Sequence, residues 1–201
     1  MFQNILNYTA QTLSYRLPKP VFNSIYTAYS KLRGNYHYYL PYTKEFQATQ
    51  ITENLYIGDI YSLYQREFLK QNGITHVVSV VLGITPPYPN DFKYLTLNAI
   101  DEEKQNLIDK FDDAITFIDK AINENGKVLI HCICGVSRSV TICSAYLIYK
   151  NYYQVNEVIE MIKSKRKVAN PNESFVEQLN IFYKNHSQNK IQDEYNGITS
   201  V

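Results

Sequence analysis

The chain has 201 residues, and its 20 basic and 19 acidic side chains leave a formal net charge of +1. This length suits one domain with a sizeable core plus an extension, and three cysteines are too few for a disulfide framework. No apolar run approaches the ~18 residues of a membrane-spanning helix, and residues 1–20 lack the apolar stretch of a secretory signal. We therefore expect an intracellular, reducing location, the cytoplasm first, with the nucleus or an organelle left open.

Residues 1–44 form a basic extension. They hold five basic side chains and no acidic one, whereas residues 45–201 hold 15 basic and 19 acidic ones. Apolar residues recur at helical spacing in two segments of the extension, one containing Phe2, Ile5, Leu6 and Leu13 and the other Phe22, Ile25, Tyr29 and Leu32. Three interpretations stay open: packing on the following domain or a dimer contact, attachment to a membrane surface or a protein, and a transit peptide.

Residues 45–186 alternate between short apolar strands and helical patterns. The expected strands are Leu55–Ile57, Thr75–Val80, Phe92–Leu97 and Lys127–His131. The expected helices are Ser62–Gln71, Leu107–Asn125, one that begins at Ser139, Val155–Lys165 and Ser174–Asn185. This alternation predicts an α/β fold for residues 45–186, followed by a polar tail at 187–201.

The segment His131–Ser139, His-Cys-Ile-Cys-Gly-Val-Ser-Arg-Ser, lies between the last expected strand and the helix after it. Backbone N–H groups and the positive end of the helix dipole converge at such a point, so the loop is expected to bind an anion. Cys132 would be a thiolate there, because a helix amino terminus and a nearby cation stabilise the charged sulfur. Arg138 offers a planar fork for two phosphate oxygens, and Gly135 permits the backbone conformation that a tight loop requires.

The pattern His-Cys-x-x-Gly-x-x-Arg-Ser resembles the signature of the cysteine-dependent protein tyrosine phosphatases, and the form with Gly-Val-Ser-Arg-Ser is similar to the dual-specificity branch. The resemblance covers about residues 45–184 and includes flanking matches in the family's order: Ile51–Gly58, Asn72–Val78, Ala145–Leu147, Pro171-Asn172, Phe175 and Gln178-Leu179. It implies a central mixed, mostly parallel sheet of about five strands flanked by helices. It also implies a catalytic domain at 45–186 that works without a metal or another cofactor.

The resemblance also assigns roles to individual residues. Cys132 would be the nucleophile, Arg138 the phosphate ligand and Ser139 the group that helps the sulfur leave, while His131 would orient the loop. Asp101, 31 positions before Cys132, would be the general acid, carried on a mobile loop. From the sequence alone Asp101 could also be a helix cap, with Glu102 and Glu103 as solvated first-turn charges. The phosphate would be surrounded by the loop residues Ile133, Cys134, Gly135, Val136, Ser137 and Arg138.

The implied activity is hydrolysis of phosphotyrosine and of phosphoserine or phosphothreonine in proteins, through a cysteinyl-phosphate intermediate. Ile133, Cys134, Val136 and Ser137 add no positive charge to the loop, which favours a phosphoprotein over a lipid or RNA substrate. An idle loop that only binds phosphorylated partners is a further alternative. No nucleic-acid partner is expected.

Two further features of the sequence, Cys134 and a basic cluster, can each be interpreted in two ways. Cys134 either fills space under the loop or captures an oxidised Cys132, although a bridge between residues so close would be strained. The basic cluster of Lys163, Lys165, Arg166 and Lys167 either complements a helix dipole in solvent or attracts an acidic, doubly phosphorylated substrate.

Overall fold

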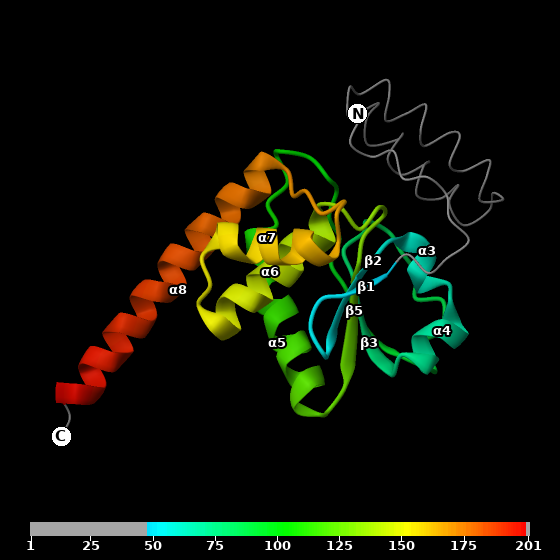
Figure 1. The fold of residues 1–201 in the computed structure, drawn as a ribbon, viewed down its shortest axis with the longest axis horizontal. Helices are drawn as coiled ribbons and strands as arrows, with labels where there is room; N and C mark the ends of the chain where they lie inside the picture. Colours follow the sequence, from blue (N-terminus) through cyan, green and yellow to red (C-terminus); the bar gives the residue numbers. More distant parts are fainter. Residues whose placement is uncertain (1–47, 200–201) are drawn as a thin grey trace.

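A five-stranded sheet forms the centre of the computed structural model, which describes residues 48–199, with side chains up to residue 188 (Figure 1). The strand order across the sheet is β1-β2-β5-β3-β4. Only the pair β1 and β2 is antiparallel, and the other three pairs are parallel, so the predicted mixed, mostly parallel sheet is confirmed. The strands are β1 Thr49–Gln50, β2 Leu55–Gly58, β3 Ile74–Ser79, β4 Lys93–Thr96 and β5 Lys127–His131.

β5 is the middle strand, and it leads directly into the motif loop. Its apolar residues Val128, Leu129 and Ile130 are all fully buried, as expected for a parallel strand covered on both faces. Its last residue, His131, is in register with Gly58 of β2 on one side and Ser79 of β3 on the other. The motif loop therefore starts at the end of a strand that is hydrogen-bonded to a neighbouring strand on each side.

Helices cover both faces of the sheet (Figure 1). One face carries two short helices, and the other carries α5 and α6, with α7 and α8 packed outside α6. Almost the whole first three turns of α6 are buried, which fits its position between the sheet and the outer helices. The helices are α3 Ile60–Leu63, α4 Arg66–Gln71, α5 Phe111–Asn123, α6 Arg138–Asn151, α7 Val155–Lys165 and α8 Glu173–Thr199, and a 3-10 turn at Ile108–Lys110 precedes α5.

The predicted helix at Ser62–Gln71 is wrong in one respect, because the chain forms two helices there. Asp59 Oδ1 accepts hydrogen bonds from Ser62 N and Ser62 Oγ, each at 2.8 Å, so the first helix starts early at Ile60. This capping box is a local signal that fixes the entry of the chain after β2.

Two other helices differ from their predicted bounds. The predicted helix at Leu107–Asn125 begins as a 3-10 turn and ends at Asn123. The last helix does not end at Asn185 but continues to Thr199, through most of the segment expected as a polar tail. The predictions for the basic extension at 1–44 lie outside the described residues.

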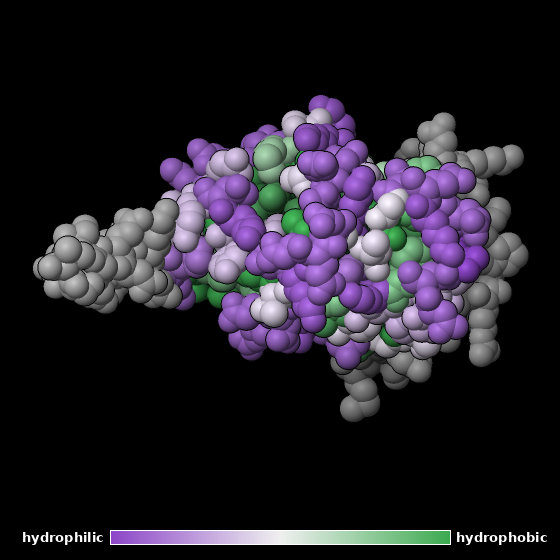
Figure 2. Space-filling model, turned by 90° about the horizontal axis from the view of Figure 1, so that it is seen from below, coloured by the Kyte–Doolittle hydropathy of each residue, from purple (hydrophilic) through white to green (hydrophobic). Residues whose placement is uncertain are grey.

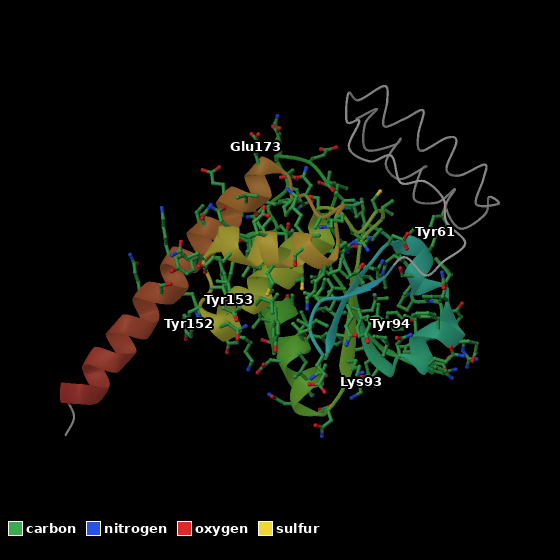
Figure 3. All side chains as sticks on the ribbon, in the orientation of Figure 1. Tyr61, Lys93, Tyr94, Tyr152, Tyr153 and Glu173 are labelled. Atoms are coloured by element: carbon green, nitrogen blue, oxygen red, sulfur yellow. The ribbon has the colours of Figure 1, made fainter. Side chains whose placement is uncertain are left out.

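Two exposed charged residues mark opposite ends of the molecule. Glu173, at the start of α8, lies at the end of the molecule that carries the motif loop, and Lys93, at the start of β4, lies at the other end (Figure 3). Seen from below, the molecule is covered mainly by hydrophilic side chains, with apolar residues confined to gaps between them (Figure 2).

Within residues 48–199, no helix has the length and apolar character to cross a membrane.

Candidate active site

The motif loop occupies the predicted junction between the carboxyl end of β5 and the amino end of α6. Two hydrogen-bond donors approach the Cys132 sulfur there: the backbone N of Gly135 at 3.2 Å and the hydroxyl Oγ of Ser139 at 3.3 Å. Donors at this distance stabilise negative charge on the sulfur. All three cysteines of the chain are free thiols, so Cys132 and Cys134 are not bridged.

Gly135 is required by both conformation and space. Its φ of +64° lies in the left-handed region, which glycine adopts at little energetic cost. A Cβ built on it would stand 2.6 Å from the carbonyl oxygen of Gly58, and it would also collide with the guanidinium of Arg166. No other residue type fits this position without moving the end of β2.

His131 lies under the loop as a neutral, buried ring. Its Nδ1 is 3.3 Å from the carbonyl oxygen of Cys132, which can only accept, so Nδ1 carries the proton. Its Nε2 then accepts from the Ser79 hydroxyl at 2.8 Å. Burial is the main cause that lowers the pKa of His131 to about 4, so the ring stays uncharged at neutral pH. These contacts hold the ring in place under the loop, and its role in orienting the loop stays a prediction.

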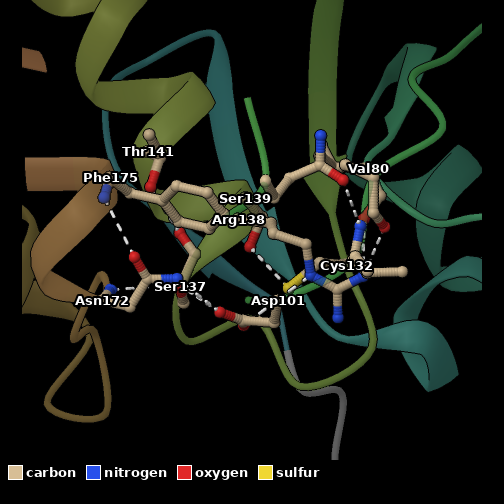
Figure 4. A network of polar contacts seen from close by, with 12 residues as sticks. Val80, Asp101, Cys132, Ser137, Arg138, Ser139, Thr141, Asn172 and Phe175 are labelled. Carbon is tan, nitrogen blue, oxygen red and sulfur yellow. Dashed lines mark hydrogen bonds and ion pairs between the residues drawn. The ribbon is translucent and has the colours of Figure 1, made fainter. Parts of the chain in front are cut away.

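Asp101 reaches the loop from the segment after β4 (Figure 4). Its Oδ1 accepts from Ser137 Oγ at 2.9 Å and from Asn172 Nδ2 at 3.0 Å. Its Oδ2 lies 3.7 Å from Nε of Arg138. The carboxyl group is therefore beside the motif loop in this structure.

Arg138 is buried, and backbone groups fix its orientation. Its Nη1 donates to the carbonyl oxygens of Val80 at 3.3 Å and of Ala99 at 3.0 Å. These oxygens belong to the segments that follow β3 and β4, so the ends of two strands set the plane of the guanidinium. A guanidinium fixed in this way is preorganised for a tetrahedral oxyanion above the loop.

The other loop residues are held to the scaffold by their backbone. The carbonyl oxygen of Ile133 accepts from Ile60 N at 3.0 Å, and that of Val136 accepts from Asn170 N at 2.8 Å. Hydrogen bonds from two neighbouring segments therefore hold these carbonyl groups in place. The side chains of Ile133, Cys134 and Val136 are buried and carry no charge themselves.

In the basic cluster at the end of α7, Lys163, Lys165 and Lys167 are exposed, as expected for solvated charges at a helix end, whereas Arg166 departs from both interpretations. Arg166 is buried under the loop, where its Nε donates to the carbonyl of Gly135 at 2.7 Å and its Nη2 to that of Cys134 at 3.4 Å. Its Nη1 also reaches Thr49 Oγ1 at 3.1 Å. Lys165 donates to the carbonyl of Ile51 at 2.7 Å. Arg166 therefore supports the loop from its buried side, and Lys165, although exposed, is bonded to the backbone before β2.

Sequence reasoning missed two functional positions, Arg166 and Asn172. The sequence leaves Arg166 either in solvent or facing a substrate, and no local pattern connects it with its partner Gly135, 31 residues away. Asn172 was noted only as part of a flanking match, although its amide contacts Asp101. Among the described residues, no group of three or more histidine, cysteine, aspartate or glutamate side chains is placed to hold a metal ion.

A mostly parallel sheet that presents a cysteine and an arginine in one loop between a strand and a helix defines a phosphatase domain of the cysteine-dependent class. The family model for the dual specificity phosphatase catalytic domain matches residues 55–185, from β2 into α8. This chain therefore belongs to the dual specificity phosphatase family and is a protein phosphatase.

Two plant proteins described as dual specificity protein phosphatases are similar to this chain in sequence. Dual specificity protein phosphatase 1B of Arabidopsis thaliana is 40% identical over 136 residues, which cover 68% of this chain and 81% of that protein. Dual specificity protein phosphatase 1 of the same plant is 40% identical over 129 residues, covering 64% of this chain and 65% of the relative. The predicted family is thus confirmed from sequence.

Two solved structures are similar to this chain in fold. The crystal structure of DUSP15 matches with a TM-score of 0.67 and 31% identity, and covers 69% of this chain and 88% of the other. A mouse dual specificity phosphatase structure, complexed with zinc tungstate, matches with a TM-score of 0.71 and 25% identity over 76% of this chain and 96% of that one. The predicted fold class is confirmed by these similarities.

Proposed function

We propose that this chain hydrolyses phosphotyrosine and phosphoserine or phosphothreonine in proteins, with Cys132 as nucleophile and Asp101 as general acid. The observation that carries the proposal is the pair of donors on the Cys132 sulfur, with the Asp101 carboxyl beside the same loop. Nucleophile, phosphate ligand and proton donor thus converge at one end of the sheet.

In the first step the Cys132 sulfur attacks the phosphorus in line with the ester oxygen. An S–P bond forms, the P–O bond of the ester breaks, and the proton of Asp101 moves to the leaving oxygen. Arg138 and the loop N–H groups stabilise the charge on the three equatorial oxygens.

In the second step water attacks the phosphorus of the phosphocysteine. The Asp101 carboxylate takes a proton from the water, the S–P bond breaks, and inorganic phosphate leaves. The departing sulfur regains its charge where the Ser139 hydroxyl and the Gly135 N–H donate to it. The enzyme returns to its starting state with Asp101 protonated.

Two observations support phosphoproteins as substrates, and a third supports an oxyanion site. The relatives are described as dual specificity protein phosphatases. The loop interior is uncharged apart from Arg138, and the nearby cations Lys165 and Arg166 are engaged with backbone carbonyls. Tungstate, present in the mouse structure, is a tetrahedral oxyanion like phosphate, which supports an oxyanion site of the same kind in this chain.

The test is hydrolysis of p-nitrophenyl phosphate, followed by release of phosphate from phosphotyrosine and phosphothreonine peptides. Vanadate should block the reaction, and Cys132→Ser should abolish it while the variant still binds a phosphopeptide. A folded wild-type chain that binds phosphopeptides without hydrolysing any of these esters would contradict the proposal and indicate a binding module. A phosphoinositide or RNA 5′-phosphate cleaved much faster than the peptides would contradict the substrate class alone.

A further inference from the structure

The start of α8 contacts the segment that carries Asp101. This segment, residues 97–107, runs from the end of β4 to the 3-10 turn and is called the acid loop below. Two amide side chains reach it from the α8 side: Asn172, the residue before the helix, and Gln178, on the second turn. Neither has a role in the two chemical steps above.

The orientation of the Asn172 amide follows from its contacts. Its oxygen accepts from the backbone N of Phe175 at 2.9 Å, which caps the first turn of α8. The other end of the amide must then be Nδ2, and this group donates to Asp101 Oδ1 at 3.0 Å. Figure 4 shows these contacts on either side of the Asn172 side chain.

The Ser137 hydroxyl completes the arrangement. It accepts from the backbone N of Asn172 at 3.2 Å, and its own proton is directed to Asp101 Oδ1 at 2.9 Å. Asp101 Oδ1 therefore receives two donors and acts only as an acceptor. The transferable proton is left to Oδ2, the oxygen nearest the Arg138 guanidinium.

Gln178 holds the other end of the acid loop to the same helix. Its Oε1 accepts from the backbone N of Leu107 at 2.7 Å and of Ile108 at 2.9 Å, and its Nε2 donates to the carbonyl of Gln105 at 2.9 Å. The Gln105 side chain in turn accepts from the backbone N of Ile100 at 3.1 Å, next to Asp101. The acid loop is thus held at Asp101 by the residue before α8 and at its carboxyl end by Gln178 of α8.

We propose that Asn172 and Gln178 are positioning residues through which the amino-terminal turns of α8 hold the general acid in place, with its proton on Oδ2, before substrate binds. This inference rests on the proposed role of Asp101. It assigns to α8 a part in the reaction that is separate from its packing against α6.

The decisive variant is Asn172→Asp. Aspartate keeps the oxygen that caps α8 but replaces the donor to Asp101 with a second carboxylate oxygen. We expect kcat/KM for phenyl phosphate, whose leaving group needs the proton, to fall about tenfold or more, because one hydrogen bond to Asp101 is lost and a carboxylate oxygen takes its place. For p-nitrophenyl phosphate, which leaves readily without a proton, the fall should stay within about threefold. Asn180→Asp, the same change at an exposed site of α8, is the matched control and should leave both rates unchanged.

Two further variants distinguish an effect that acts through Asp101 from a general loss of activity or folding. In an Asp101→Asn background, adding Asn172→Asp should cause no further loss with phenyl phosphate, because the amide acts only through Asp101. Gln178→Glu, which keeps the acceptor for Leu107 and Ile108 but loses the donor to Gln105, should slow phenyl phosphate selectively and by a smaller factor; it also serves if Asn172→Asp fails to fold.

Equal losses on both esters, or a loss that adds to that of Asp101→Asn, would overturn the positioning role. If Asp101→Asn itself hydrolyses phenyl phosphate like the wild type, the general acid in the proposed function is wrong. If Asp101→Asn is slow but Asn172→Asp and Gln178→Glu match the wild type, only the role of α8 is wrong.

Discussion

The buried His131 makes stability depend on pH in a range where carboxylates are still ionised. In the unfolded chain a histidine takes up a proton near pH 6.5, whereas burial lowers the pKa of the folded His131 to about 4. Between these values the unfolded state binds more protons than the folded state. Stability from this group is therefore fully present above about pH 6.5 and is lost as the pH falls toward about 4.

The structure also gives the size of the effect. Linkage with these two pKa values predicts a loss of about 2 kcal/mol between neutral pH and about pH 5, rising to about 3 kcal/mol near pH 4. Urea denaturation followed by far-UV circular dichroism at pH 7, 6 and 5 measures it directly. His131→Gln, which cannot take up a proton, should remove this part of the pH dependence.

His76 is the necessary control. Burial is the largest cause that lowers its pKa as well, so it adds to the same trend and His131→Gln should reduce the slope without flattening it. His76→Gln should leave the larger His131 contribution intact. If the unfolding free energy of His131→Gln falls between pH 7 and 5 as steeply as that of the wild type, the ring is not held neutral and the orienting role must be abandoned.

Three substitutions test the rest of the loop. Gly135→Ala should lower kcat/KM at least about tenfold, because Gly135 has a φ of +64° and a Cβ there collides with Gly58 and Arg166. Gly73→Ala is the control: its φ is +72°, but a Cβ has no neighbour closer than 3.8 Å, so only the melting temperature should fall. Equal activity of the two variants would contradict the argument that Gly135 has no room for a side chain. Arg166→Lys keeps the charge but loses the fork under the loop, so kcat should fall about tenfold, whereas the exposed Arg66→Lys should not change it. Ser139→Ala removes a donor from the departing sulfur, so acid-quench mass spectrometry should find more phosphocysteine at steady state; no accumulation would mean that the hydroxyl does not assist the second step.

Local patterns were enough to predict the elements next to the site. β5 and α7 have the predicted bounds, and the loop between β5 and α6 is where the motif required it. These segments are predictable because each carries its own period and its own end signal, such as the turn before Lys127. Bounds failed where a cap or a change of helix type decides them, as at Asp59 and at Ile108.

The parts that could not be predicted are contacts between distant segments. Arg166 and Asn172 follow α7, yet they hold Gly135 and Asp101, which come from two other parts of the chain. Charge and spacing along the sequence describe a basic residue at a helix end, but not the carbonyl that it meets after folding. The contacts of Gln178 with the acid loop could not be predicted for the same reason.

The position of β5 in the middle of the sheet has a consequence for hydrogen exchange. The strand that delivers Cys132 is bonded to β2 and β3 on both sides, and the carbonyl of His131 still accepts from Val80 N at 2.8 Å. Such a segment opens only when the whole sheet opens, so its amides should exchange at the rate set by global unfolding. The nucleophile thus belongs to the slowest-exchanging unit of the molecule, and heat should inactivate the enzyme and unfold it at the same temperature.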